Sequence, residues 1–282
     1  MHQLSWAKKN ISLCLYPYET VDIRYNDQTG DIIATCCCNL ESPPIIGSDS
    51  KDIFLNIKKE MESGQLPKNC RKCINEEKNG GISERVRGIL TKSAQELDDF
   101  LLTYKSTNYE IRTSASNLCS LSCRSCSPNN SSTYAKITNH ELIFSSLDAT
   151  KNIDYWNYFT NLVQQNVGKI DNLHIHLIGG EPLSQKSTIK ILNWLVVNGF
   201  SKQLFLSFTT SLTPHISSEI LELIKKFKAI SFILSIDSIS ENYKYVRWPA
   251  KFDKVESNLE LLLKYKRDGK ITEVNVKLVS IK

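Results

Sequence analysis

The segment Cys119-Ser-Leu-Ser-Cys123-Arg-Ser-Cys126 places three cysteines on one short stretch, with three and then two residues between them. Thiolates at this spacing can turn toward one metal centre from a single loop. A closed structural metal site has four protein ligands, so a set of three leaves one coordination position open. The segment therefore predicts a metal centre that keeps a position for a further ligand.

From Arg112 onward, short apolar strands alternate with longer amphipathic helices. The predicted strands cover 112–117, 173–178, 204–209, 230–236 and 272–281. The predicted helices cover 153–167, 187–198, 214–227 and 253–266. Strand–helix–strand units at this spacing are right-handed and build a parallel sheet. With about five strands, an open sheet or partial barrel fits better than a closed eight-stranded barrel.

A glycine-rich segment, Gly179-Gly180-Glu181-Pro182, follows the second predicted strand. Sites in parallel α/β sheets form at the carboxyl ends of the strands. Because the triple-cysteine segment follows the first strand, we expect both loops to face the same mouth. The glycines let the backbone approach a ligand closely, and Glu181 can accept a hydrogen bond from an ammonium group.

These two segments together resemble the radical SAM enzymes, which carry a C-x3-C-x2-C loop after the first barrel strand and a GGE segment after the second. The resemblance implies a [4Fe–4S] cluster held by Cys119, Cys123 and Cys126. It also implies that the open iron binds S-adenosylmethionine (SAM), whose methionyl amine would meet the backbone at 179–180 and Glu181. Reductive cleavage of SAM would give a 5′-deoxyadenosyl radical that abstracts hydrogen from a substrate.

The resemblance continues more loosely downstream. Phe208-Thr-Thr210-Ser211 is similar to a T-N-G segment at the end of the third strand, and Ser235-Ile-Asp237-Ser238 is similar to an S-x-D-G segment that reaches the SAM ribose. Arg247 lies in a region similar to one that meets the SAM carboxylate. Simple strand-end capping and a surface arginine are the alternative interpretations of these positions. One departure is Ser125, which stands where the family often has an aromatic residue that shields the adenine.

A second group of cysteines lies near the N-terminus, in a region whose first 50 residues are expected to be β-rich. Its members are Cys14, Cys36, Cys37, Cys38, Cys70 and Cys73. A hairpin is predicted at 21–36, and a short helix at 51–61. The region resembles the auxiliary-cluster domains called twitch or SPASM, which implies a second [4Fe–4S] cluster. A tetrahedral zinc site suits the C-x2-C pair equally well, and the ligand among Cys36, Cys37 and Cys38 stays open.

These patterns divide the chain into an auxiliary-cluster domain at 1–88, a helical linker at 89–110 and a radical SAM partial barrel at 111–282. The expected fold is α/β, with a smaller cysteine-rich α+β domain at the N-terminus. The linker region carries a basic pair, Arg85 and Arg87, just before it, and a helix predicted around 94–104. Because the family's core usually has six strands, the barrel is expected to be truncated at its C-terminus.

The composition gives no sign of nucleic-acid binding, of a membrane span or of secretion. The net charge of +5 is mild, and no Lys/Arg block with interleaved aromatic residues marks nucleic-acid binding. No apolar run approaches the roughly 18–20 residues of a membrane span, and the first residues lack a secretory signal. We therefore expect a cytoplasmic protein, where the nine grouped cysteines are metal ligands rather than disulfides.

Three functions compete on these patterns. The first is a radical SAM enzyme that takes electrons from a flavodoxin or ferredoxin and modifies a peptide or protein, a substrate favoured by analogy alone while carbohydrates and nucleotides stay open. The second is a truncated or non-catalytic zinc or iron–sulfur protein, with His140 completing the three-cysteine site. The third is a glycyl-radical activating enzyme. His174 and His176 are expected to pack in the sheet rather than to act as acids, and no catalytic acid is assigned.

Overall fold

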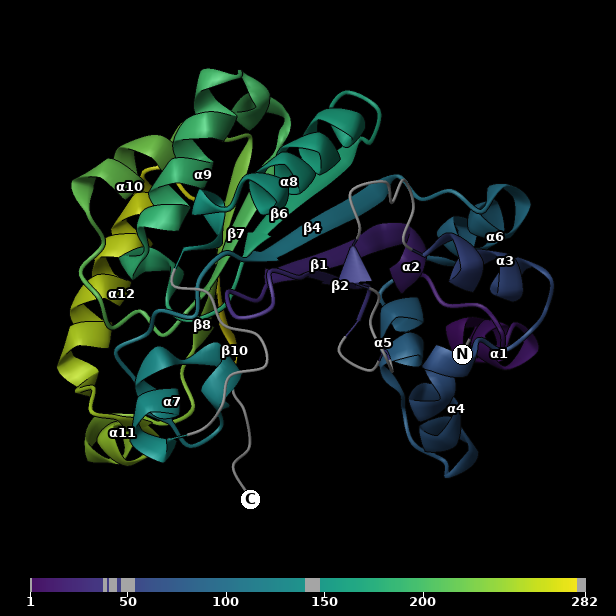
Figure 1. Cartoon of the computed structure of the whole chain (residues 1–282), viewed down its shortest axis with the longest axis horizontal. Helices are drawn as coiled ribbons and strands as arrows, with labels where there is room; N and C mark the ends of the chain where they lie inside the picture. Colours follow the sequence, from purple (N-terminus) through teal and green to yellow (C-terminus); the bar gives the residue numbers. More distant parts are fainter. Residues whose placement is uncertain (1, 38–39, 41–44, 47–53, 140–147, 278–282) are drawn as a thin grey trace. The chain divides into compact units, whose positions relative to one another are not determined.

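The structure is a computed structural model of the chain, and it describes residues 2–37, 40, 45–46, 54–139 and 148–277 (Figure 1). Several sequence-based expectations fall outside these ranges: Cys38, His140, the start of the helix predicted at 51–61 and the end of the strand predicted at 272–281. The chain divides into two compact units. The first unit comprises Met1–Ile23 and Ile32–Glu110, and the second comprises Arg24–Asp31 and Ile111–Lys282.

The second unit is built on the strands expected from the sequence. They are β4 (Asn108–Ser114), β6 (Asn172–Leu177), β7 (Phe205–Thr210), β8 (Ala229–Ser235) and β10 (Glu273–Lys277). The neighbours follow the order β10-β8-β7-β6-β4, and the pairs β6–β7, β7–β8 and β8–β10 are parallel. The order runs along the sequence without reversal, as in a barrel and unlike a doubly wound sheet. An α/β fold with a mostly parallel sheet is thereby confirmed.

Helices that connect these strands run alongside them in Figure 1. They are α8 (Ile153–Asn166), α9 (Lys186–Val197), α10 (Ser218–Ile224) and α12 (Phe252–Arg267). Side-chain caps begin α8 and α10, because Asn152 and Ser217 accept hydrogen bonds from backbone amides in the first turn. The core between helices and sheet is apolar, and the rings of Phe208 and Phe232 stack across β7 and β8 with centroids 5.1 Å apart.

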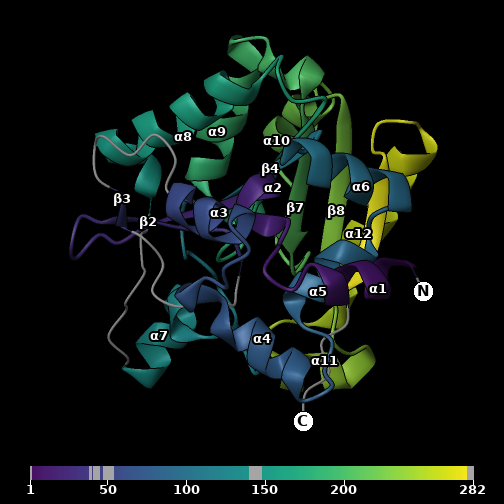
Figure 2. The ribbon, with the colours of Figure 1, turned by 90° about the vertical axis from the view of Figure 1, so that its right-hand side faces the viewer.

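Short elements complete the second unit around the strand ends. They are β5 (Ser122–Cys123), α7 (Ser132–Thr138), α11 (Ser240–Val246) and β9 (Arg247–Trp248). β5 and β9 pair antiparallel, with Cys123 opposite Arg247. Both α7 and α11 lie at the lower end of this unit in Figures 1 and 2. Single 3-10 turns cover Pro128–Asn130, Ala149–Lys151, Pro182–Ser184 and Phe200–Gln203.

The first unit mixes helices with three short strands, which belong to one eight-stranded sheet of the order β10-β8-β7-β6-β4-β1-β2-β3. Its strands are β1 (Thr20–Tyr25), β2 (Ile32–Thr35) and β3 (Ile45–Ile46), and β2 pairs antiparallel with β3. Its helices are α1 (His2–Lys9), α2 (Tyr16–Glu19), α3 (Leu55–Glu62), α4 (Arg71–Lys78), α5 (Glu84–Leu90) and α6 (Ala94–Thr103), with a 3-10 turn at Lys68–Cys70. The predicted hairpin is present as β1 and β2. The helix predicted around 94–104 is α6, which begins with a capping box of Ser93 and Glu96.

The expectation of a β-rich start is wrong for the first residues, which form α1. Trp6 and Ala7 are buried on one side of this helix, and α5 contacts it. Only eight residues long, α1 has too few apolar positions for its period to show in the sequence. Its stability comes instead from tertiary contacts that the sequence does not display.

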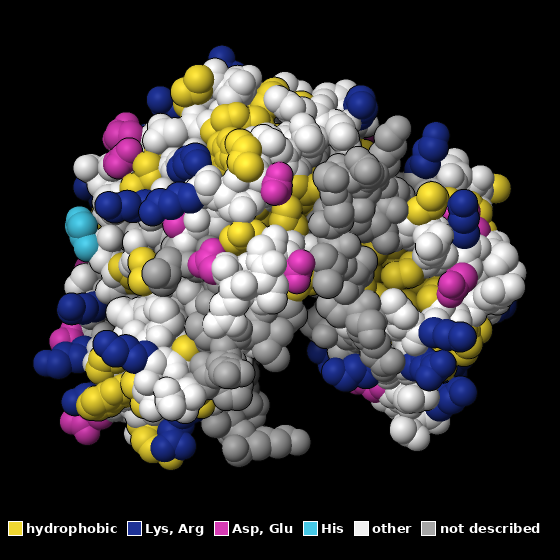
Figure 3. All heavy atoms as spheres, viewed as in Figure 1, with side chains coloured by type: hydrophobic (Ala, Val, Ile, Leu, Met, Phe, Trp, Pro, Cys, Tyr) yellow, Lys and Arg dark blue, Asp and Glu magenta, His cyan; other side chains and the backbone are white. Residues whose placement is uncertain are grey.

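In the part of the chain that the structure describes, no helix is long and apolar enough to cross a membrane. On the face shown in Figure 3, lysine and arginine side chains are dispersed among acidic and apolar ones.

Candidate functional site

The triple-cysteine loop begins just beyond β4 and is fixed by the start of α7. Cys119 donates its backbone N–H to the Ser132 hydroxyl at 3.2 Å, and its carbonyl accepts from the Thr133 hydroxyl at 2.7 Å. Ser131 donates to the carbonyl of Leu121 and also caps α7. The three consecutive hydroxyl residues therefore hold the loop that carries the cysteines. Sequence analysis did not identify them, although a hydroxyl run before a helix is a recognisable capping signal.

The cysteine loop contains a backbone turn, and one of its thiols lies close to Arg247 of β9. Cys126 donates its backbone N–H to the carbonyl of Cys123 at 3.0 Å, which makes a turn between the second and third cysteines. Arg247 Nη1 lies 3.6 Å from Cys123 Sγ. Burial raises the pKa of Cys119 to about 11 and that of Cys123 to about 12, and it raises the pKa of Cys126 as well. These thiols are neutral near pH 7, so metal binding at this loop would release protons.

The Gly179–Pro182 loop meets the backbone of the cysteine loop directly. Glu181 donates its backbone N–H to the carbonyl of Leu118 at 2.9 Å. Gly180 has φ 53°, and a Cβ there would lie 2.4 Å from the carbonyl oxygen of Leu118. Gly179 has φ 81°, and a Cβ there would overlap the Ser114 hydroxyl. Both glycines are thus required by backbone conformation and by the close approach of β4 and the loop that follows it.

Gln185 joins the two loops a second time. This side chain is 3% exposed, and its Nε2 contacts the carbonyls of Ser116 at 3.2 Å, Leu118 at 3.2 Å and Gly179 at 2.9 Å. The residue was missed in the sequence because its partners lie as far as 69 positions away.

The Glu181 carboxylate ties the end of β6 to the end of β7. It accepts from Thr210 Oγ1 at 2.6 Å and from the backbone N–H of Ser211 at 2.8 Å, and the Ser211 hydroxyl also donates to it. The residue is 2% exposed, and burial raises the pKa of its carboxyl despite these bonds. The carboxylate is therefore occupied by strand-end donors, which leaves the backbone of 179–180 as the part of the segment that is free of this network.

Asp237 and Arg247 form a buried ion pair next to the cysteine loop. Arg247 Nη2 lies 2.6 Å from Asp237 Oδ2, and the Ser125 hydroxyl lies 3.4 Å from the same oxygen. The structure thus brings Asp237, Arg247, Ser125 and Cys123 together from three segments of the second unit. Arg247 Nε and Asn117 Nδ2 are buried donors without a partner among the described residues. Such donors suit a polar or anionic ligand at this place.

The turn after β7 is held by two residues that sequence analysis gave no role at the site. Tyr243 donates its hydroxyl to the carbonyl of Ser211 at 3.3 Å, and Asn258 Nδ2 donates to the carbonyls of Leu212 and Pro214, both at 2.9 Å. Leu212 has φ 58°, an uncommon conformation for a leucine. These three bonds hold the turn that begins at Ser211, the residue that donates to Glu181.

Ser235 lies at the carboxyl end of β8, and Thr210 lies at the carboxyl end of β7. The cysteine loop and the glycine-rich loop likewise follow the carboxyl ends of their strands, β4 and β6. His174 and His176 lie further back on β6, with stacked rings 5.9 Å apart. His176 Nε2 is 2.8 Å from Thr209 Oγ1, so this histidine is hydrogen-bonded within the sheet.

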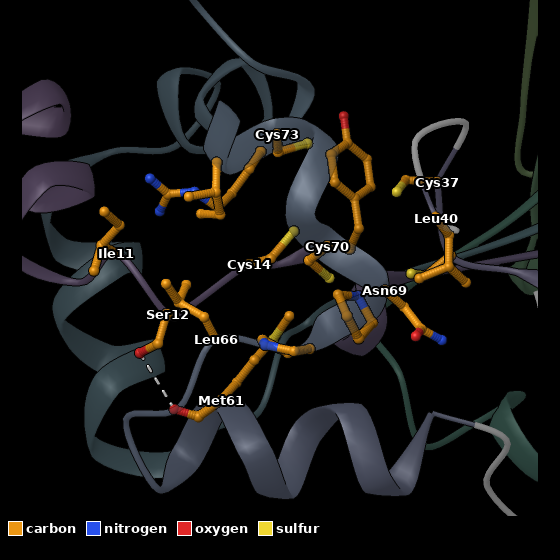
Figure 4. A pocket seen from close by; sticks show the side chains of 16 residues that line it. Ile11, Ser12, Cys14, Cys37, Leu40, Met61, Leu66, Asn69, Cys70 and Cys73 are labelled. Atoms are coloured by element: carbon orange, nitrogen blue, oxygen red, sulfur yellow. Dashed lines mark hydrogen bonds between the residues drawn. The ribbon is translucent and has the colours of Figure 1, made fainter. Parts of the chain in front are cut away.

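The N-terminal cysteines gather in the first unit. Figure 4 shows them around one pocket, to which Tyr16, Met61 and Ile74 contribute apolar side chains. The cysteines that line it are Cys14, Cys36, Cys37, Cys70 and Cys73. Burial raises the pKa of Cys14, and a hydrogen bond that the Cys36 thiol donates to Cys37, together with burial, raises the pKa of Cys36. Three separate segments, around Cys14, at Cys36–Cys37 and at Cys70–Cys73, thus supply thiols to one place.

Neither cysteine group has the geometry of a ready single-ion site. Among the residues that the structure describes, no three His, Cys, Asp or Glu side chains converge as the ligands of one metal ion do. A tetrahedral zinc ion needs such convergence, with sulfurs about 2.3 Å from the ion. The cysteines of a four-iron cluster bind different iron atoms, so their sulfurs need not converge on one point.

No family model and no curated protein matches the sequence. Among solved structures, the chain is similar to native anSMEcpe with bound AdoMet and Cp18Cys peptide, at 22% identity and a TM-score of 0.40 over 59% of this chain and 41% of that one. It is also similar to Streptococcus suis SuiB bound to S-adenosylmethionine, at 16% identity and a TM-score of 0.44 over 93% and 56%. SuiB bound to its precursor peptide SuiA gives 15% identity and the same score and coverage. The chain thus spans about two fifths to just over half of the length of these structures, and at these scores the likeness carries no argument about function.

Proposed function

We propose that this chain is a radical SAM enzyme that binds a [4Fe–4S] cluster through Cys119, Cys123 and Cys126. The observation that carries the proposal is the direct joining of the cysteine loop to the glycine-rich loop, through the 2.9 Å bond between Glu181 N–H and the Leu118 carbonyl and through Gln185. A three-thiolate loop leaves a coordination position for a further ligand, and the adjoining glycine-rich loop lies beside it.

The residues around the loop fit SAM as this ligand. The backbone at Gly179 and Gly180 would hold the methionyl amine, and Glu181, whose carboxylate accepts from Thr210 and Ser211, would fix this backbone at the strand ends. Arg247 and Asn117 have buried donors without partners among the described residues, which fit the SAM carboxylate or other polar groups of the ligand. The remaining contacts, to the ribose and adenine, are proposed for Thr210, Ser235 and Asp237.

Cys119, Cys123 and Cys126 would hold the cluster, and the chemistry that it would supply when bound is one-electron reduction of SAM to methionine and a 5′-deoxyadenosyl radical. That radical would take a hydrogen atom from the substrate and become 5′-deoxyadenosine. The electron would come from a flavodoxin or ferredoxin. The protein's own part is to orient SAM, to exclude water and to keep the Asp237–Arg247 pair beside Cys123.

A second [4Fe–4S] cluster is proposed for the first unit, held by Cys14, Cys70, Cys73 and either Cys36 or Cys37. Its support is that these thiols line one largely apolar pocket from three segments of the chain. By analogy with enzymes that carry such a second site, the proposed substrate is a peptide or protein. The proposal places the protein in the cytoplasm, where thiols stay reduced and available to metals.

The test is anaerobic purification and reconstitution, followed by counting of iron and zinc and by reduction with SAM present. We expect about eight irons per chain and formation of 5′-deoxyadenosine. Changing Cys123 to Ala should abolish SAM cleavage and remove about four irons, whereas Cys73→Ala should remove a similar number and spare cleavage. Ser120→Ala, an exposed change within the same loop, is the matched control and should behave as the parent. Zinc without iron, or cleavage that survives Cys123→Ala, would contradict the proposal.

A further inference from the structure

Arg85 lies on α5 of the first unit, and all the N–H groups of its side chain have hydrogen-bond acceptors. It is 4% exposed although the sequence marks it only as half of a basic pair with the exposed Arg87. A guanidinium has five N–H groups. Arg85 directs them to five acceptors, which are the carbonyls of Ala7, Asn10 and Leu13 and the two carboxylate oxygens of Glu77.

The three carbonyls lie at the end of α1 and in the turn that follows it. Arg85 Nη2 donates to Ala7 at 3.3 Å, and Nη1 donates to Asn10 at 3.2 Å and Leu13 at 3.0 Å. Carbonyls past a helix end have no partner within the helix and need one from elsewhere. Leu13 directly precedes Cys14, so the guanidinium fixes the backbone that carries the first cysteine.

The carboxylate partner fixes a different cysteine. Glu77 lies on α4, four residues after Cys73 and therefore one turn along the same helix. Arg85 Nε donates to Glu77 Oε1 at 2.9 Å, and the Ser83 hydroxyl, which caps α5, donates to the same oxygen. The planar guanidinium thus joins the Cys14 segment on one side to the Cys73 helix on the other, and its bidentate geometry restricts their relative placement.

Arg85 also lines the cysteine pocket itself, together with Cys14 and Cys73. We propose that Arg85, held by Glu77, is a positioning residue that sets Cys14 against Cys73 and so preassembles the thiolate site of the first unit. This inference rests on the proposed function, because it takes the site to bind an iron–sulfur cluster. Residues that orient metal ligands commonly contribute tenfold or more to metal affinity.

The test uses the full chain with Cys119, Cys123 and Cys126 all changed to Ala, so that bound iron reports the first unit alone. Into this parent we would introduce Arg85→Gln, Arg85→Lys and, as the matched control on the same helix, Arg87→Gln. The measurements are iron and sulfide per chain, the rate of iron release to a chelator, and the electron paramagnetic resonance spectrum of the reduced cluster. Circular dichroism of each metal-free chain checks that the fold is kept.

Arg87→Gln should match the parent, at about four irons per chain. Arg85→Gln should release iron at least about tenfold faster. Arg85→Lys keeps the positive charge but loses the planar set of donors, so it should retain part of the iron. Its electron paramagnetic resonance spectrum should be altered. A merely structural role of Arg85 would leave that spectrum unchanged. Parent-like release and spectrum in both Arg85 variants would overturn the inference.

Two further arms keep the test decisive. If Arg85→Gln does not fold, the test is made with Glu77→Gln, and Glu76→Gln at the exposed neighbouring position is its control. Faster iron release from Glu77→Gln than from Glu76→Gln supports the inference, and equal rates of release overturn it. If the parent binds no iron, the proposed second cluster fails, yet the positioning role is still measured by alkylation of Cys14 with iodoacetamide in the metal-free chain. Faster Cys14 modification in Arg85→Gln than in Arg87→Gln supports the role, and equal rates overturn it.

Discussion

Gly180 shows how one residue can set the distance between the two loops of the candidate site. Its φ of 53° lies in the left-handed region, and a Cβ would stand 2.4 Å from the Leu118 carbonyl oxygen and 2.7 Å from Gln185 Nε2. Gly199 also has a positive φ, 74°, but a Cβ there would meet nothing within 4 Å. The two positions share the conformational requirement and differ in the steric one.

Changing Gly180 to Ala is therefore expected to push the glycine-rich loop away from the cysteine loop. Under the proposed function, SAM cleavage should fall by at least about tenfold, because misplacement of about 1 Å can cost a hundredfold in rate. Gly199→Ala should cost about 1–2 kcal/mol of stability for the left-handed conformation while leaving cleavage by the folded protein unchanged. The comparison is made by 5′-deoxyadenosine formation together with thermal unfolding. Equal rates of SAM cleavage in the two variants would show that the close approach of the loops at Gly180 is not needed for cleavage.

The cysteines and glycines of the site could be predicted because their chemistry is local in sequence. Three thiols within eight residues, or two adjacent glycines before a glutamate, carry their meaning in a single segment. Gln185 and Arg85 could not be predicted, because their partners lie up to 69 and 78 positions away. Ser125 is intermediate: its departure from the expected aromatic residue was visible, but its 3.4 Å contact with Asp237 was not.

At the scale of elements, the strands of the second unit could be predicted from their apolar runs, and β6, β7 and β8 lie within a residue or two of the expected ranges. Helices α1 and α5 could not, since they have eight and seven residues and too little periodic pattern. What holds them is the network of Arg85, Glu77 and Ser83, which also links α5 to α4. This network has a titratable member, so its contribution to stability depends on pH.

Burial disfavours the charged form of Glu77, but hydrogen bonds from Arg85 and Ser83 outweigh it and hold the pKa of this carboxyl below its ordinary value of 4.5. The native state then binds fewer protons than the unfolded state between the two pKa values. The stability that Glu77 contributes is therefore complete above the unfolded pKa and is lost as the pH falls through the native one.

Denaturant unfolding of the metal-free chain should show this dependence directly. We expect Glu77→Gln to be less stable than the wild type at about pH 7, and the difference between them to shrink below about pH 4.5. Glu76→Gln, at the exposed neighbouring position, should follow the wild type at every pH. A difference between wild type and Glu77→Gln that stays constant on acidification would show that the carboxylate charge does not stabilise the network.

At the scale of the whole molecule, neither unit is one continuous segment. Residues Arg24–Asp31, the tip of the hairpin between β1 and β2, belong to the second unit, whose remaining residues begin at Ile111. No sequence pattern reveals this assignment, and side-chain contacts within the second unit agree with it. The Tyr25 ring lies 6.2 Å from that of Tyr155, and the Tyr25 hydroxyl accepts from Asn152 Nδ2 at 2.8 Å.

Asn152 is the N-cap of α8, so Tyr25 is expected to stabilise the start of a helix more than 120 positions away. Tyr25→Ala should remove the ring contact and leave the cap without its partner, at a cost of about 1–3 kcal/mol. Hydrogen exchange should then quicken at the first-turn amides of α8, while α6, in the first unit, should exchange as in the wild type. Tyr245→Ala, at a side chain that is 64% exposed, serves as the control and should leave α8 unchanged. Unchanged exchange at α8 in Tyr25→Ala would show that the Tyr25 side chain does not stabilise the start of this helix.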